Sequence, residues 1–130
     1  KNEAGRKIIV LLTDGADQGS VYKLPEALKQ AHLADTVIYG FFYYERGYYS
    51  DEGVLKKMSQ ETGGRVFEVT RRGGLDDAFR QLEEEMRSQY ALSYTPANEK
   101  KDGSFRRIEI KTKDGNLKVQ ARRGYYASNG

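Results

Sequence analysis

Cysteine and tryptophan are absent from this 130-residue chain, which also holds only one histidine and two prolines. The lack of cysteine excludes disulfides, thiolate zinc sites and cysteine nucleophiles together. The single histidine, His32, leaves histidine-rich zinc sites and Ser-His-Asp triads without the residues that they need. No apolar run approaches the roughly 20 residues that a membrane-spanning helix requires. The sequence therefore predicts no transmembrane segment and argues against hydrolase chemistry.

Positive charge is moderate overall but uneven along the chain. The formal net charge is +3, and residues 96–130 hold nine Lys and Arg against four Asp and Glu. The first 95 residues hold 13 basic and 15 acidic residues, so the excess positive charge lies in the tail. Such a tail can meet phosphate or an acidic partner, but basic residues on exposed strand faces more often serve solubility. We expect no nucleic-acid binding.

The first 89 residues alternate between two kinds of pattern. Continuous apolar runs, typical of strands covered on both faces of a parallel sheet, occur at residues 7–13, 36–43 and 65–69. Each run is followed by an amphipathic helical pattern, at residues 20–35, 50–64 and 73–89, and the last of these places Phe79 and Met86 on its core-facing stripe. Gly63 suits the left-handed position at the end of the second helix. Three β-α pairs in succession predict an α/β layer architecture with parallel strands.

The hydrophobic period changes after Gln89. Residues 90–95, 105–112 and 117–123 alternate between apolar and polar side chains, and the segment 113–116, Lys-Asp-Gly-Asn, carries an Asp-Gly pair favoured in tight hairpins. We therefore expect two regions: a three-strand, three-helix α/β region at 1–89 with Rossmann-like topology, and an antiparallel β extension at 90–130.

Carboxylates and tyrosines follow the first two predicted strands directly. Asp14 and Asp17 come after the first strand, where Thr13 would help to orient their loop. The run after the second strand contributes four tyrosines, Tyr43, Tyr44, Tyr48 and Tyr49. Ligands of open parallel sheets bind beyond the carboxyl ends of the strands, and carboxylate and hydroxyl oxygens suit Mg²⁺. The pattern predicts a cation and ligand site at this edge.

Each of these residues also has a purely structural interpretation. Asp14 followed by Gly15 is a common turn sequence after a strand. Asp17 can be a solvent-exposed loop residue instead of a residue that supports the metal ligands. Thr13 is a β-branched residue at a strand end, as many strands have. Clustered tyrosines offer rigid contact area to a partner, but they are also common where half-buried strand ends meet water.

Five blocks in order cover essentially the whole chain: KIIVLLTDGAD, TVIYGFFY, GVLKKMSQETGGRVFEV, LDDAFRQLEEEMRSQYALSYTP and GSFRRIEIKTKDGNLKVQARRGYYA. This ordered series resembles the later half of a von Willebrand factor type A domain, in particular the VWFA-related proteins of acidobacteria. The resemblance implies a non-enzymatic, extracytoplasmic binding domain built around a metal-ion-dependent adhesion site. In that site a divalent cation, held in part by the Asp of the Thr-Asp-Gly segment, accepts an acidic group of a protein partner.

Asp14 is the position that matches this site. The family's D-x-S-x-S motif is absent from the 130 residues, and by the resemblance it would lie before Lys1. One carboxylate does not define a Mg²⁺ site, since the ion needs several oxygens placed in advance. We therefore expect an incomplete adhesion site that binds divalent metal poorly in this chain, and an apolar edge at residues 7–13 that favours self-association.

Two other functions remain open on the sequence. Asp14 and Asp17 are paired acids at a strand end, as in enzymes that use Mg²⁺ for phosphoryl transfer or nuclease chemistry, although no phosphate loop or lysine accompanies them. The basic tail is also compatible with a structural module that docks anionic envelope components without a metal.

Overall fold

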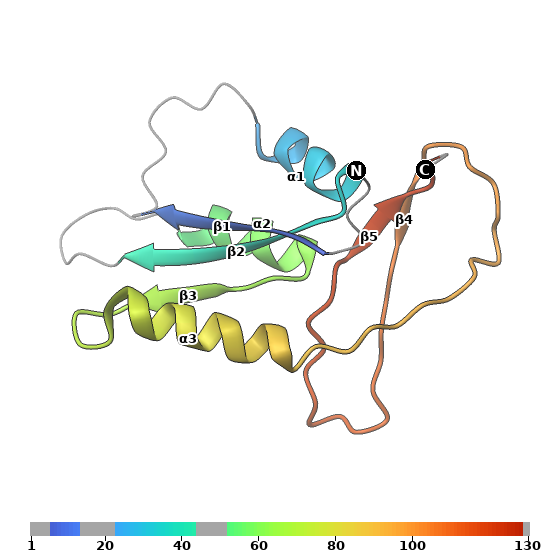
Figure 1. Cartoon of the computed structure of the whole chain (residues 1–130). Helices are drawn as coiled ribbons and strands as arrows, with labels where there is room; N and C mark the ends of the chain where they lie inside the picture. Colours follow the sequence, from blue (N-terminus) through green and yellow to red (C-terminus); the bar gives the residue numbers. More distant parts are fainter. Residues whose placement is uncertain (1–5, 14–22, 44–51, 129–130) are drawn as a thin grey trace.

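The computed structural model describes residues 6–13, 23–43 and 52–128. Three parallel strands alternate with three helices, and two short antiparallel strands follow (Figure 1). The predicted α/β layout is confirmed. The elements, in chain order, are β1 Lys7–Thr13, α1 Leu24–Leu33, β2 Thr36–Tyr43, α2 Glu52–Thr62, β3 Val66–Val69, α3 Gly74–Arg87, β4 Phe105–Arg107 and β5 Gly124–Tyr126.

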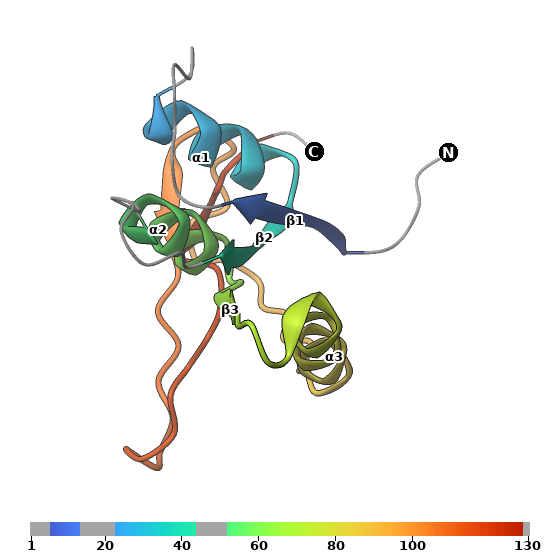
Figure 2. The ribbon, with the colours of Figure 1, turned by 90° about the vertical axis from the view of Figure 1, so that its left-hand side faces the viewer.

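The parallel sheet has the order β1-β2-β3, with β2 in the centre. β1 pairs with β2 from Lys7↔Thr36 to Thr13↔Phe42, and β2 pairs with β3 from Gly40↔Val66 to Tyr43↔Val69. β2 is buried along almost its whole length, because it has a strand on each side and helices on both faces. Seen along the sheet, α1 and α2 lie on one face and α3 lies on the other (Figure 2).

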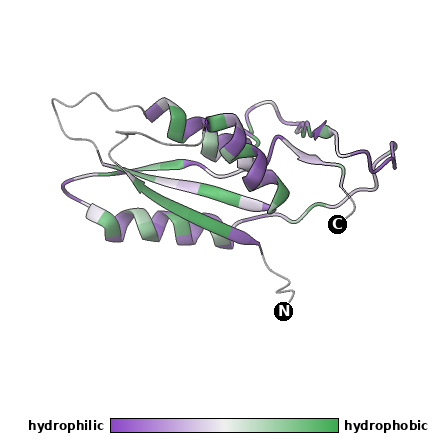
Figure 3. Cartoon of the chain, turned by 90° about the horizontal axis from the view of Figure 1, so that it is seen from above, coloured by the Kyte–Doolittle hydropathy of each residue, from purple (hydrophilic) through white to green (hydrophobic). Residues whose placement is uncertain are grey.

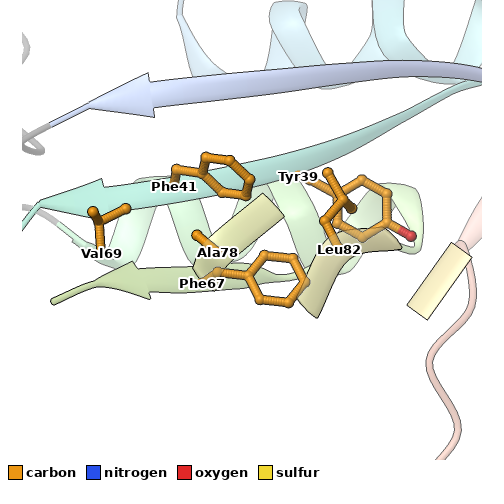
Figure 4. Close-up of a cluster of buried hydrophobic side chains, with 6 residues drawn as sticks. All are labelled: Tyr39, Phe41, Phe67, Val69, Ala78 and Leu82. Carbon is orange, nitrogen blue, oxygen red and sulfur yellow. The ribbon is translucent and has the colours of Figure 1, made fainter. Parts of the chain in front are cut away.

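The hydrophobic core lies between the sheet and α3. Aromatic side chains of β2 and β3 meet two small or branched side chains of the helix, as Figure 4 shows for Tyr39, Phe41, Phe67, Val69, Ala78 and Leu82. Tyr39 is fully buried, and its hydroxyl accepts a hydrogen bond from Gln89 Nε2 at 2.9 Å. Full burial of one such side chain contributes about 1.5–3 kcal/mol, so this cluster is the main source of cohesion on this face.

On the opposite face, α2 approaches β2 closely. A Cβ added at Gly40 would lie 2.7 Å from the side chain of Leu55, so glycine at this position allows the helix to sit against the strand. At the end of the helix, the buried Thr62 hydroxyl accepts a hydrogen bond from the Ile38 backbone N–H at 3.0 Å. Gly63 then ends the helix with a φ of 93°, as the sequence predicts.

β1 differs from the expected strand covered on both faces. It lies at the edge of the sheet, and Leu12 is 54% exposed, with Ile9 and Val10 also exposed. Figure 3 shows the hydrophobic residues running along this strand. The expectation of burial on both faces was wrong, because a continuous apolar run reports which side chains are apolar and leaves open whether a neighbour covers them. The apolar edge expected at residues 7–13 is found. Among the described elements, none pairs with the outer edge of β1.

The apolar stripe of α3 is also less covered than predicted. Phe79 and Met86 are exposed, although Phe79 meets the edge of the Phe41 ring with centroids 4.8 Å apart. α3 packs on β3 and on the side chains of β2, and no described element covers β1 on this face (Figure 2). Val10 and Leu12 of β1 align with Tyr39 and Phe41, so they lie on the same face of the sheet as the exposed side chains of α3.

We call residues 90–128 the C-terminal arm and residues 6–13, 23–43 and 52–89 the α/β unit. The arm forms a hairpin in which Phe105 pairs with Tyr126 and Arg107 with Gly124. Its turn closes where Leu117 N–H donates to Asp114 O at 3.2 Å, close to the predicted position. The predicted strands were too long: residues 90–95, 108–112 and 117–123 are not in strands. Alternation alone was insufficient, because these segments lack a further strand or helix to cover their apolar side chains.

Candidate binding rim at the carboxyl edge of the sheet

The three parallel strands end together at one edge, which we call the carboxyl rim (Figure 1). Thr13 is the last residue of β1 and aligns with Phe42, while Tyr43 is the last residue of β2 and aligns with Val69. The structure therefore brings Thr13 and Tyr43 to the same edge on neighbouring strands, as predicted. Both are half-buried.

Their side chains point to opposite faces of the sheet. Tyr43 packs against the cluster on the α3 face, together with Phe41 two residues before it. Thr13 is aligned with Phe42, whose side chain alternates to the face of α1 and α2. Tyr43 therefore contributes to the core as well as to the rim, which matches the structural interpretation of that tyrosine. Of the two residues, Tyr43 belongs to the α3 cluster, and the side chain of Thr13 lies on the face of α1 and α2.

The other predicted site residues lie outside the described part of the chain. These are Asp14, Asp17, Tyr44, Tyr48 and Tyr49. In the sequence, Asp14 directly follows Thr13 and Tyr44 directly follows Tyr43. The described part of the rim therefore consists of the strand ends that directly precede these two segments. Among the described residues, no group of three or more His, Cys, Asp or Glu side chains is arranged to hold a metal ion.

Sequence reasoning missed the third contribution to the rim. Thr70 directly follows β3, and its hydroxyl accepts a hydrogen bond from the Gly73 backbone N–H at 3.1 Å. The next two residues, Arg71 and Arg72, are exposed, and no ion pair joins either of them to the rest of the described chain. Because both follow a strand directly, the rule that pointed to Asp14 would also have found them. They give the rim positive charge that attracts an acidic group.

His32 lies away from this rim. It is near the end of α1, which leads into the start of β2 at the opposite edge of the sheet. Its ring contacts Phe105 and Tyr126 of the arm, with centroids 5.2 Å and 6.4 Å apart. Burial among these rings lowers the pKa of His32 below its usual value, against a smaller opposing attraction from Glu61. The histidine joins the arm to the α/β unit.

Comparison with known proteins bears on the fold alone. No family model matches the chain, and no curated protein matches it. The structure is similar to the crystal structure of an uncharacterized membrane-spanning protein from Vibrio fischeri, with a TM-score of 0.54 and 24% sequence identity. The similarity covers 64% of this chain and 48% of that chain, so it spans about half of the relative. In the part of our chain that the structure describes, every helix is too short or too polar to cross a bilayer.

Proposed function

We propose that this chain is the later part of a von Willebrand factor A-type binding domain, and that it acts by binding a protein without catalysing a reaction. The domain would work outside the cytoplasm, with a divalent cation such as Mg²⁺ at the carboxyl rim. Asp14 is the proposed metal ligand, Asp17 lies behind it, and Thr13 orients their loop. Tyr44, Tyr48 and Tyr49, with Tyr43 at their base, provide contact area for the partner.

The observation that carries this proposal is the uncovered outer side of β1. Ligand sites of open α/β sheets lie in a crevice between two strands, so a site at the end of β1 needs a wall on each side of it. β2 provides one wall, and nothing in the described structure stands at the other side. The adhesion site is therefore proposed to be incomplete in this chain and complete when a further strand joins β1.

The charge of the rim supports an acidic partner. Arg71 and Arg72 follow β3 at the same edge and are exposed. In the proposed site the cation accepts a carboxylate of the partner, and two guanidinium groups nearby favour approach of the same negative charge. The Mg²⁺-dependent enzyme is the weaker alternative. Among the described residues, only these two arginines suit a phosphate as well as they suit a carboxylate. The structural module without a metal depends on the basic arm instead of the rim.

Manganese titration of the labelled chain tests the site. Mn²⁺ replaces Mg²⁺ among oxygen ligands and broadens the NMR signals of nearby amides. We expect weak binding, with a dissociation constant of about 1 mM or higher because few oxygens are in place, and selective broadening at Thr13. Asp14→Asn should remove the broadening, whereas Asp76→Asn, at an exposed position in the first turn of α3, should leave it.

Three outcomes would contradict the proposal. Micromolar binding of Mn²⁺ by the monomer would show that the site is complete without another strand. Metal-dependent phosphatase or nuclease turnover that disappears in Asp14→Ala would place the protein among enzymes. Broadening that is equal in both Asn variants would remove Asp14 from the site.

We also propose that the chain self-associates through β1. An unpaired edge strand with exposed apolar side chains offers its backbone groups to another strand. Sedimentation velocity should show association that increases with protein concentration. A charge on the edge strand opposes such pairing, so Leu12→Lys should shift the protein toward the monomer. A wild-type protein that stays monomeric at millimolar concentration would disprove this contact.

A further inference from the structure

The hairpin of the C-terminal arm (residues 105–126) carries an apolar face and a polar face. Its register is set at the base by Arg106↔Tyr125 and continues where Ile108 N–H donates to Arg123 O at 2.9 Å. Beyond this hydrogen bond the two branches are not in strands. The alternation of an extended backbone, carried on toward the turn, would place alternate residues of both branches on one face. That face holds the apolar residues Ile108, Ile110, Leu117, Val119, Ala121 and Tyr125 together with Arg106, Thr112, Asp114 and Arg123, and we call it the apolar hairpin face.

The polar face is the one directed at the α/β unit. Gln120 Nε2 donates to Gly63 O at 3.3 Å, and Arg122 forms an ion pair with Asp35. At the base of the hairpin, Phe105 of this same face packs against His32. The apolar hairpin face is consequently turned away, and Ile110, Leu117 and Val119 are exposed. This is the reverse of the usual arrangement, in which the polar face of a β-ribbon meets water.

A small hollow lies on the apolar hairpin face. Residues of both branches line it: the aliphatic residues Ile108, Ile110, Val119 and Ala121, and the charged residues Glu109, Arg122 and Arg123. Its volume of about 70 Å³ is well below the roughly 300–1,000 Å³ of small-molecule sites. A hollow of this size accommodates a single aliphatic side chain. The surface therefore suits contact with a protein segment better than binding of a free metabolite.

Charge decides between possible partners of this face. The hairpin holds seven basic and two acidic residues between Phe105 and Tyr126, and Arg123 has no ion pair within the described chain. A second copy would bring the same positive charge and be repelled. An anionic bilayer is disfavoured by geometry, since Lys111, Lys113 and Lys118 are on the polar face. Apolar contact with lipid would turn these lysines away from the head groups.

We propose that the apolar hairpin face binds an acidic segment of a protein partner. One aliphatic side chain of the partner enters the hollow between Ile110 and Val119, and a neighbouring carboxylate pairs with Arg123. This contact uses no metal and no residue of the carboxyl rim. Its success or failure is therefore independent of the adhesion site proposed above.

An NMR titration of the ¹⁵N-labelled chain with a short synthetic peptide tests the proposal. The probe is a strand-forming heptapeptide, Glu-Val-Glu-Ile-Glu-Val-Glu, added in the presence of EDTA. We expect saturable shifts centred on Ile108, Ile110, Val119 and Ala121. A peptide with lysine in place of every glutamate should bind at least tenfold more weakly, and so should one with alanine in place of valine and isoleucine.

Matched variants locate the contact. Val119→Ser should weaken binding at least tenfold, whereas Val54→Ser, on α2, should have no effect because the two valines are equally exposed at 41% and 42%. Arg123→Glu should abolish the preference for glutamate over lysine. Since both valines are exposed, loss of binding in one variant alone cannot be attributed to unfolding.

Three results would overturn the proposal. Equal binding of the glutamate and lysine peptides would show that charge does not select the partner. Binding to phosphatidylglycerol vesicles that is lost in Val119→Ser, without binding to the acidic peptide, would make the face a lipid contact. Dimerisation that is lost in Val119→Ser would make it a contact between two copies.

Discussion

The α/β unit and the C-terminal arm begin from equally clear sequence patterns and reach different degrees of burial. β2 has a strand on each side and helices on both faces, and six of its eight residues are buried. β4 and β5 pair only with each other and contact α1 at His32, and no residue from 109 to 120 is buried. The comparison separates two properties of a strand pattern. The pattern decides which side chains share a face, while neighbouring elements decide whether that face is covered.

The first prediction contrasts truncation of a large side chain in the two regions. Phe41 is 1% exposed and contacts Phe67 and Phe79, so Phe41→Ala should leave a cavity and lower the free energy of unfolding by about 3–5 kcal/mol. Ile110 is exposed on the arm, so Ile110→Ala should change it by less than about 0.5 kcal/mol. Urea denaturation followed by far-UV circular dichroism measures both.

Equal effects of these two substitutions would remove the distinction between the regions. A large loss in Ile110→Ala would mean that the arm is covered in solution, by a second molecule or by a different packing. A small loss in Phe41→Ala would mean that the core on the α3 face is loosely packed. The unfolding slope with urea should be similar in both variants if both remain two-state.

The sequence predicted the α/β unit well because its signals are local. The runs at 7–13 and 36–43 match β1 and β2 to the residue, and Gly63 ends α2 in the predicted conformation. The local pattern of residues 7–13 indicated burial on both faces, and only the family resemblance indicated an apolar edge there. The exposure of Phe79 was not predicted, since its cover depends on an element that the described structure lacks. For the rim, the order of the strands placed Thr13 and Tyr43 correctly. The opposite directions of their side chains follow only from the pairing register.

The second prediction applies one substitution to a buried and an exposed threonine. The Thr62 hydroxyl accepts from Ile38 N–H and donates to Met58 O at 2.9 Å, so Thr62→Val leaves a buried N–H without its partner. We expect a loss of about 1–3 kcal/mol in the free energy of unfolding. Thr112 donates to Asp114 O at 2.7 Å in the exposed turn, where water replaces the lost bond. Thr112→Val should therefore change stability by less than about 0.5 kcal/mol.

Hydrogen exchange gives an independent measurement of the same contrast. In Thr62→Val, the amide of Ile38 should exchange faster than in the wild type, because its hydrogen bond to the side chain is gone. A protected Ile38 amide and unchanged stability would show that another acceptor replaces the hydroxyl. That result would place the stability of the helix-to-sheet contact elsewhere, for example at Gly40 and Leu55.

The third prediction concerns His32, where the arm meets the α/β unit, and its effect should be the smallest. Burial lowers the pKa of His32 below 6.5 in the folded protein, so near this pH the unfolded chain binds more protons. Stability should therefore fall as pH falls from about 7.5 through 6.5 and level off below the folded pKa. Arg122 adds to this effect and Glu61 opposes it.

The chain has no other histidine, so the slope in this pH window reports on His32 with little interference from other side chains. His32→Phe keeps an aromatic ring against Phe105 and Tyr126 but cannot titrate, and its stability should be flat between pH 7.5 and 5.5. Thermal unfolding of both proteins across this range measures the difference. If protonation releases the arm alone, the amides of residues 105–107 should lose protection below pH 6 while those of β2 keep it. If both lose protection together, the arm and the α/β unit unfold as one cooperative structure, and the contrast between them is limited to burial.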